Sequence, residues 1–153
     1  MMGTVPGKGL RVPMLASGPG AKNRLLELCI DLPAQITVIS EHTGDAATRK
    51  LLRSITMKGL AANVIEAMRA AEQAGCAEWL WNNMAEEINR ADETMLFRVV
   101  SGTSTHAKRR LHEMEAAQGL LHDLGIEPLM TTATVENLRH IQDQGIPHIP
   151  EKR

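Results

Sequence analysis

Apolar residues recur at helical spacing through most of the chain after residue 44. Between residues 45 and 74 the apolar positions of this pattern are Leu51, Leu52, Ile55, Leu60, Val64, Ile65 and Met68. This spacing predicts one long helix, and Gly75 follows it as a stop signal. Shorter helices are predicted at 77–88, 91–100, 106–124 and 131–144, with breaks at Ser101-Gly-Thr-Ser and Gly125-Ile-Glu-Pro.

The first part of the chain has a different pattern. Residues 1–9 are rich in glycine and lack periodicity, which is typical of a loop. Residues 10–17 and 36–40 predict short strands, with a turn at 18–20 and an amphipathic helix at 21–32 between them. Because two short strands do not form a stable sheet alone, we expect the chain to start in mid-structure, with strand partners upstream.

Composition supports a helical body. The chain of 153 residues is 43% hydrophobic but only 2% aromatic, so its core must consist mainly of aliphatic side chains and Met. A net charge of -1 gives no electrostatic reason to expect nucleic acid or an anionic membrane as partner. Two cysteines without CxxC spacing, no membrane-spanning apolar run and no signal pattern predict a cytoplasmic protein with free thiols.

Two glycine motifs resemble nucleotide sites only in part. Gly18-Pro-Gly20 opens a helix after a strand, but Asn23 stands at the third glycine of the dinucleotide fingerprint, so a simple turn is favoured. The segment Gly3 to Gly9 is one residue short of a phosphate-binding loop. No metal site is predicted either, because the histidines at 106, 112 and 122 do not share a helix face.

Lys50 carries the strongest chemical signal. It follows a glycine and short residues near the start of the long helix, where the helix dipole disfavours a cation. Ser54 lies one turn further on the same face, so both polar ends can reach one small molecule. A residue that breaks a local preference can mark function, and a lysine amine can take a proton from an alcohol.

A basic cluster begins the helix predicted at 106–124. It contains Lys108, Arg109 and Arg110 after a Ser-Gly-Thr-Ser segment. A solvated helix start is the ordinary interpretation of such a cluster, and a site for a carboxylate or phosphate is the alternative. Arg109 is therefore a candidate substrate-binding residue.

The Lys50 helix resembles the G-x-x-x-K-x-x-x-N signature of the β-hydroxyacid dehydrogenase superfamily, with Ala46 at the glycine and Ser54 at the asparagine. Segments 55–62, 66–72, 109–114 and 124–128 are similar, in order and spacing, to the C-terminal domain of 6-phosphogluconate dehydrogenase-like proteins that bind NAD(P). The resemblance covers most of residues 1–145. It implies a mainly α fold, in which an all-helical domain follows a short α/β remnant of a Rossmann domain.

The resemblance also implies roles for single residues. In this family a Rossmann domain binds NAD or NADP, a glycine-rich loop contacts substrate, and a lysine of the helical domain is the general base. Gly3 and Thr4 resemble the loop, Lys50 the base, and Ser54 the group that orients the substrate carboxylate. Met57 replaces the glutamate that protonates the enediol after decarboxylation, so oxidation without decarboxylation is expected. Lys58 is adjacent and is a further substrate-binding candidate.

These expectations define three segments: a Rossmann remnant at 1–43, a helical substrate-binding and dimerisation domain at 44–145, and a tail at 146–153. The predicted function is the substrate side of an NAD(P)-dependent hydroxyacid dehydrogenase, a homodimer acting on a small hydroxy acid. Without the cofactor domain we expect the chain to be inactive and to bind no NAD or NADP tightly. Alternatives are a non-catalytic helical dimerisation or protein-interaction module and a gene fragment with no retained role.

Overall fold

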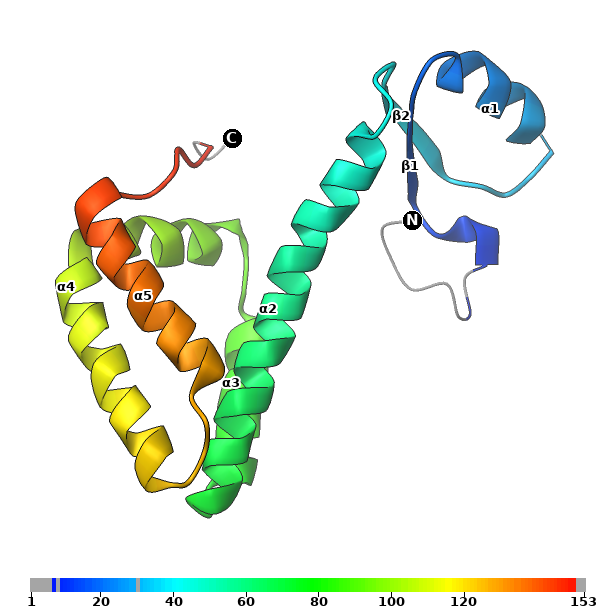
Figure 1. The fold of residues 1–153 in the computed structure, drawn as a ribbon. Coiled ribbons are helices and arrows are strands. Elements are labelled where there is room, and N and C mark those ends of the chain that lie inside the picture. Colours follow the sequence, from blue (N-terminus) through cyan, green and yellow to red (C-terminus); the bar gives the residue numbers. More distant parts are fainter. Residues whose placement is uncertain (1–6, 8, 30, 151–153) are drawn as a thin grey trace. The chain divides into compact units, whose positions relative to one another are not determined.

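The computed structural model describes residues 7, 9–29 and 31–150 (Figure 1). The chain divides into two compact units, residues 1–59 and 60–153. Its elements in order are a 3-10 turn Gly9–Arg11, β1 Met14–Ser17, α1 Ala21–Cys29, β2 Ile36–Ser40, α2 Asp45–Gln73, α3 Ala77–Asn89, α4 Glu93–Asp123 and α5 Leu129–Gln144. Within the part of the chain that the structure describes, no helix has the length and apolar character needed to cross a membrane.

The first unit is built on a strand–helix–strand arrangement. β1 and β2 are parallel, and their register runs from Met14 opposite Ile36 to Ser17 opposite Ser40, with an irregularity between Ala16 and Ser17. Parallel pairing requires a crossover, which α1 supplies. Gly18 and Gly20 both have positive φ, at 123° and 70°, as the turn predicted at 18–20 requires.

The second unit packs α5 against α4 (Figure 1). The side chains buried at this contact include Leu121 of α4 and Val135 and Leu138 of α5. Two small residues of α2, Ala70 and Ala71, are also buried. Small side chains allow close approach of helix backbones, and aliphatic ones fill the space between them, as the composition predicted.

Glu66 connects α2 to the start of α5. This buried side chain accepts hydrogen bonds from the backbone N–H of Met130 at 2.7 Å and from the backbone N–H and hydroxyl of Thr131 at 2.8 and 2.7 Å. The first N–H groups of a helix have no intrahelical partner, and here a carboxylate from another helix supplies one. Burial raises the pKa of the Glu66 carboxyl. The hydrogen bonds from the Thr131 side chain and from the backbone amides of residues 129–131 lower this pKa by more than burial raises it, so the pKa is below its usual value.

The helix break predicted at Ser101-Gly-Thr-Ser is wrong. These residues are helical, and α4 runs through them to a kink at His106, whose φ and ψ of -117° and 21° are not helical. The hydroxyls of Ser101 and Thr103 donate to the carbonyls of Phe97 and Val99, each at 2.7 Å, so their hydrogen-bonding needs are met within the helix; bonds of this kind often bend a helix. The break therefore comes a few residues after the predicted position.

Arg110 fixes the geometry of this kink. Its guanidinium reaches back across the bend and donates to the carbonyl of Val99 at 3.0 Å and to the hydroxyl of Thr103. Gly102 leaves the room for this contact, because a Cβ there would lie 3.3 Å from the guanidinium. Arg110 of the basic cluster thus has a structural partner, which the sequence pattern did not indicate.

The predicted fold class is confirmed: the chain is mainly helical, with two short strands near its start. The predicted helix at 45–74 and the predicted strand at 36–40 agree closely with α2 and β2. The predicted strand at 10–17 is shorter, because residues 9–11 form a 3-10 turn. The thiols of Cys29 and Cys76 are both free.

Glu66→Gln is expected to lower the free energy of unfolding by about 1–3 kcal/mol near neutral pH, because it removes the charge from a buried acceptor of three hydrogen bonds. Since the folded pKa is lowered, the carboxylate stabilises the fold fully above the unfolded pKa of about 4.3, and this contribution is lost as pH falls through the folded pKa. Urea unfolding at several pH values measures both effects.

Glu72→Gln is the matched control, since Glu72 is an exposed carboxylate on the same helix. Its effect is expected to stay within about 0.5 kcal/mol. Equal stability of the two variants at neutral pH would contradict the role of Glu66 as the cap of α5.

Candidate functional site

The start of α2 is tied to the ends of both strands. The hydroxyl of Ser17, the last residue of β1, accepts a hydrogen bond from the backbone N–H of Ala46 at 3.0 Å. The hydroxyl of Ser40, the last residue of β2, donates to the carboxylate of Asp45 at 2.6 Å. Because the strands are parallel, their carboxyl ends lie at the same edge of the sheet, and α2 begins at this edge.

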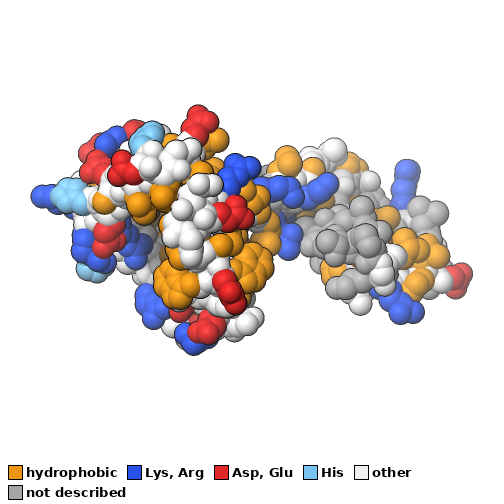
Figure 2. Space-filling model, turned by 90° about the horizontal axis from the view of Figure 1, so that it is seen from below, with side chains coloured by type: hydrophobic (Ala, Val, Ile, Leu, Met, Phe, Trp, Pro, Cys, Tyr) orange, Lys and Arg blue, Asp and Glu red, His pale blue; other side chains and the backbone are white. Residues whose placement is uncertain are grey.

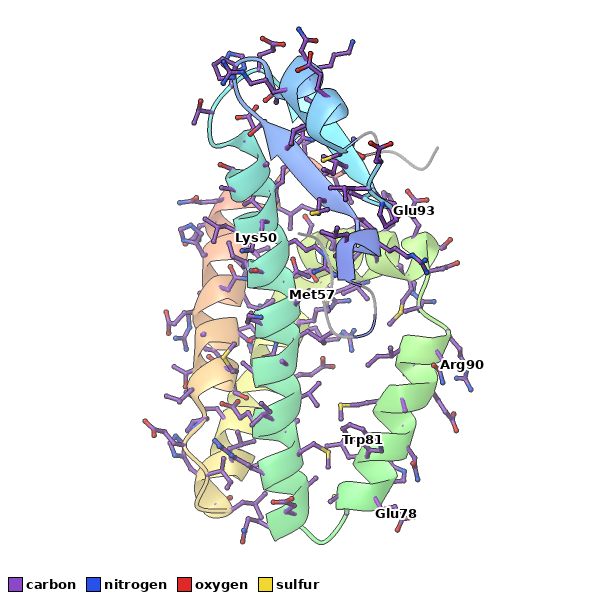
Figure 3. The ribbon with its side chains drawn as sticks, turned by 90° about the vertical axis from the view of Figure 1, so that its right-hand side faces the viewer. Lys50, Met57, Glu78, Trp81, Arg90 and Glu93 are labelled. Carbon is purple, nitrogen blue, oxygen red and sulfur yellow. The ribbon has the colours of Figure 1, made fainter. Side chains whose placement is uncertain are left out.

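Lys50 and Ser54 follow in the first turns of α2. Lys50 is exposed and Ser54 is half-buried. Four residues of α-helix place the two side chains on neighbouring positions of one face, about 6 Å apart along the axis. The structure thus places both predicted residues in one regular helix, where a small hydroxy acid between them would meet an amine and a hydroxyl. Figure 3 labels Lys50 near the first turns of α2.

Met57 and Lys58 lie further along α2. Met57 is 47% exposed, and seven residues place it near the face of Lys50 about 10 Å along the axis. A thioether cannot donate a proton, so no acid is present at this position. Lys58 is exposed and about 12 Å from Lys50 along the axis, so only its flexible end could reach a ligand held by Lys50.

The residues of the basic cluster in α4 have different surroundings. Arg109 is exposed and pairs with Glu113 one turn on, at 2.7 Å, and such exposed pairs contribute at most about 1 kcal/mol. An open cleft of about 410 Å³ at the kink is lined by Thr105, His106, Lys108, Arg109 and His112.

Arg109 belongs to the second unit and Lys50 to the first. Gly3 and Thr4 lie outside the described residues.

Another cavity of the second unit lies at the C-terminal segment. It has a volume of about 260 Å³ and an apolar lining of Leu96, Phe97 and Val100 from α4 and of Ile149 and Pro150. Residues 146 and 149 are half-buried, so the segment predicted as a tail packs against α4. Among the described residues, Glu93 supplies the one polar side chain of the lining, which gives this cavity little that could orient a hydroxy acid.

Comparison with known proteins shows that part of the chain matches a known domain family. The model of a domain of unknown function, DUF1932, matches residues 71–141, which include α3, α4 and most of α5. DUF1932 is the C-terminal helical domain of 3-hydroxyacid dehydrogenase-like proteins. The resemblance stated from the sequence is therefore confirmed.

Relatives of the whole chain are longer than the chain itself. An uncharacterised 28.5 kDa protein of Methanothermus fervidus is 27% identical over 130 residues, which cover 85% of this chain and 51% of that protein. Similar solved structures are a conserved hypothetical protein of Sinorhizobium meliloti 1021 (28% identity, 95% and 50% of the two chains, TM-score 0.44) and a conserved protein described as structurally similar to 3-hydroxyacid dehydrogenases (27%, 96% and 57%, TM-score 0.49). The chain thus spans about half the length of these relatives.

Sequence reasoning missed the residues that hold the site in place. Ser17 and Ser40 were part of predicted strands, and nothing local marks them as contacts of a helix 29 and 5 residues away. One signal was present, since both serines stand directly before glycine- or threonine-containing turns that lead to helices. Glu66 begins the family-like segment 66–72, but the pattern does not indicate its hydrogen-bond partner Thr131, which lies 65 residues away.

Ser17→Ala is expected to lower the free energy of unfolding by about 1 kcal/mol, because the N–H of Ala46 loses its acceptor at the start of α2. Ser104→Ala, at an exposed serine of α4, is the control and is expected to stay within about 0.5 kcal/mol. Urea unfolding followed by circular dichroism compares the two. A Ser17→Ala variant as stable as the control would show that this hydrogen bond does not anchor α2.

Proposed function

We propose that the chain is the substrate-binding part of an NAD(P)-dependent hydroxyacid dehydrogenase and that Lys50 is its general base. The observation that carries the proposal is the position of Lys50 and Ser54 on one face of α2, in a chain whose residues 71–141 match the model of DUF1932. The same match favours this proposal over a non-catalytic interaction module. In this proposal residues 1–43 complete a Rossmann-type domain, and residues 44–145 are the helical domain.

In this proposal the described residues supply no dinucleotide site of their own. Asn23 takes the place of the third glycine after β1, so no contact with NAD or NADP is assigned to the described residues. In this proposal the hydride acceptor is held by a separate domain, and the relative of which this chain covers 51% is long enough to contain one. This chain would contribute the substrate side of the reaction.

On that side the chemistry is proton transfer. The unprotonated amine of Lys50 accepts the proton of the substrate hydroxyl as the carbon loses its hydride, and the alcohol becomes a carbonyl. The hydroxyl of Ser54 donates a hydrogen bond to the substrate carboxylate and holds the alcohol next to the amine. Because Met57 supplies no proton, the reaction ends at oxidation and does not include acid-assisted decarboxylation.

The remaining candidates have supporting roles in this proposal. Lys58 attracts the substrate carboxylate, Arg109 binds an anionic group, and Gly3 and Thr4 form the loop that closes on the substrate. The active form is a homodimer acting on a small hydroxy acid, in the cytoplasm. The near-neutral net charge of the chain agrees with a small-molecule ligand that needs only a local positive site.

The test is to join the chain to an NAD(P)-binding domain from a longer relative and to measure NAD(P)H formation over a series of hydroxy acids. Lys50→Ala is expected to lower kcat by about 10²–10⁴-fold, because the general base is lost. Lys58→Ala is the matched control, a lysine of the same helix, and is expected to raise KM while kcat changes little.

Equal kcat values for the Lys50→Ala variant and the unchanged fusion would contradict the role of Lys50. A fusion that folds, binds NAD(P) and oxidises no hydroxy acid in the series would contradict the proposed function as a whole.

A further inference from the structure

A further cavity of the second unit lies between the last turns of α5 and the residues of α4 that precede the kink (Figure 1). Its volume is about 570 Å³, which is within the usual range for small-molecule sites. Apolar side chains of both helices line it: Val99, Val100 and Ile141. Polar side chains line it as well: Thr103, Asn137, His140 and Gln144. An apolar surface with a few convergent polar groups is the usual composition of a ligand site, and the proposed function does not use these residues.

The three polar residues of α5 form a stripe along one face of that helix. Offsets of three and seven residues place Asn137, His140 and Gln144 on the same side, about 10 Å from first to last along the axis. All three are exposed, and within the described part of the chain no hydrogen bond holds their side chains. A molecule that contacts all three is therefore elongated, and it meets an amide at each end and an imidazole between them.

The chain after α5 folds back to form one wall of the cavity. Gly145 follows α5 with φ and ψ of 74° and -164°, a backbone conformation that is essentially restricted to glycine. Its N–H donates to the carbonyl of Ile141 at 2.8 Å, and Ile146 and Pro147 then line the cavity. A Cβ at position 145 would meet no atom within 4 Å, so only the backbone conformation opposes a side chain there. The position of this wall therefore depends on Gly145.

Among the described residues of the lining there is no Lys, Arg, Asp or Glu. Figure 2 shows many such side chains on the visible face of the helical unit, on the left, so the uncharged lining is a local feature. Arg110 is bound to the carbonyl of Val99 and the hydroxyl of Thr103 but is not part of this lining. Because carboxylates and phosphates bind best to cationic donors, this lining favours a neutral ligand over a hydroxy acid or a nucleotide.

Amide, imidazole and apolar groups are the ones with which proteins bind heteroaromatic bases. Asn and Gln side chains form paired hydrogen bonds with the adjacent donor and acceptor groups of adenine. His side chains stack on the faces of bases. Contacts with a polynucleotide depend on cations that bind phosphates, and the lining offers none among its described residues.

We propose that this cavity binds a purine nucleoside of the adenosine type. His140 stacks on the base, one of the two amides at Asn137 and Gln144 pairs with the edge of the base, and the other binds the ribose hydroxyls. The apolar side chains of α4 and of the segment after Gly145 cover the remaining surface of the ring. This inference goes beyond the proposed function, because it concerns a neutral ligand and depends neither on Lys50 nor on oxidation.

Calorimetric titration of the full chain with adenosine tests the proposal. We expect saturable binding of adenosine and weaker binding of uridine, whose base lacks the adenine edge. AMP is expected to bind no tighter than adenosine, because its phosphate meets no cation of the lining. A folded chain that binds no adenosine, or that binds AMP about tenfold tighter than adenosine, would overturn the proposal.

Substitution of the amides locates the site. Asn137→Ala and Gln144→Ala are each expected to weaken adenosine binding about tenfold, and only one of them is expected to weaken the binding of free adenine. Gln142→Ala is the matched control and is expected to leave both affinities unchanged, since Gln142 is an exposed amide on another side of α5. Adenosine binding that both cavity variants retain in full would show that the nucleoside binds elsewhere.

Gly145→Ala tests the wall. It is expected to weaken adenosine binding several-fold while the helix content stays the same, because the strained backbone displaces Ile146 and Pro147. Gly119→Ala in α4 is the control, since a Cβ there also meets no atom within 4 Å and the backbone is helical. Equal affinities of these two variants would contradict the role of the segment after Gly145. Lys50→Ala is expected to leave adenosine binding unchanged, so this result is independent of the catalytic proposal.

Discussion

The capping of α5 by Glu66 is the interaction on which the helical unit depends. The other buried residues of α2 are two small ones, Ala70 and Ala71, whose methyl groups give little direction to packing. A carboxylate that accepts hydrogen bonds from Met130 and Thr131 is specific in direction, so it sets where α5 begins relative to α2. α4 then packs on α5, and the kink stabilised by Arg110 determines where the first arm of α4 and the preceding α3 can lie.

The fold was largely predictable because its signals are local. Helical spacing of apolar residues and the stop at Gly75 were sufficient to predict α2 and its end. The kink of α4 was not predictable, because it depends on where Ser101 and Thr103 donate their hydroxyl hydrogens and on Arg110, eleven residues after the carbonyl that it binds. The local pattern predicts that a segment is helical, and contacts between residues far apart in the sequence decide where that helix bends.

At the candidate site, too, the local features were predictable and the long-range contacts were not. That Lys50 and Ser54 share a face could be predicted from spacing alone, since a regular helix determines which side chains lie together. The anchors of that helix, Ser17 and Ser40, could not, because their hydrogen bonds join strand ends to a helix start. The roles of Gly3, Thr4, Lys58 and Arg109 still stand as predictions, and they concern how a substrate is held, while Lys50 concerns the chemistry itself.

The central claim is that a small hydroxy acid binds at Lys50 and Ser54. The most direct measurement is NMR of the selectively labelled lysine side chains while small hydroxy acids are titrated into the full chain. The account predicts that the Lys50 signal shifts in a saturable manner, that the Lys58 signal shifts less, and that Ser54→Ala weakens the binding. Saturable binding that leaves Lys50 unchanged, or no binding by any hydroxy acid in a folded chain, would contradict it.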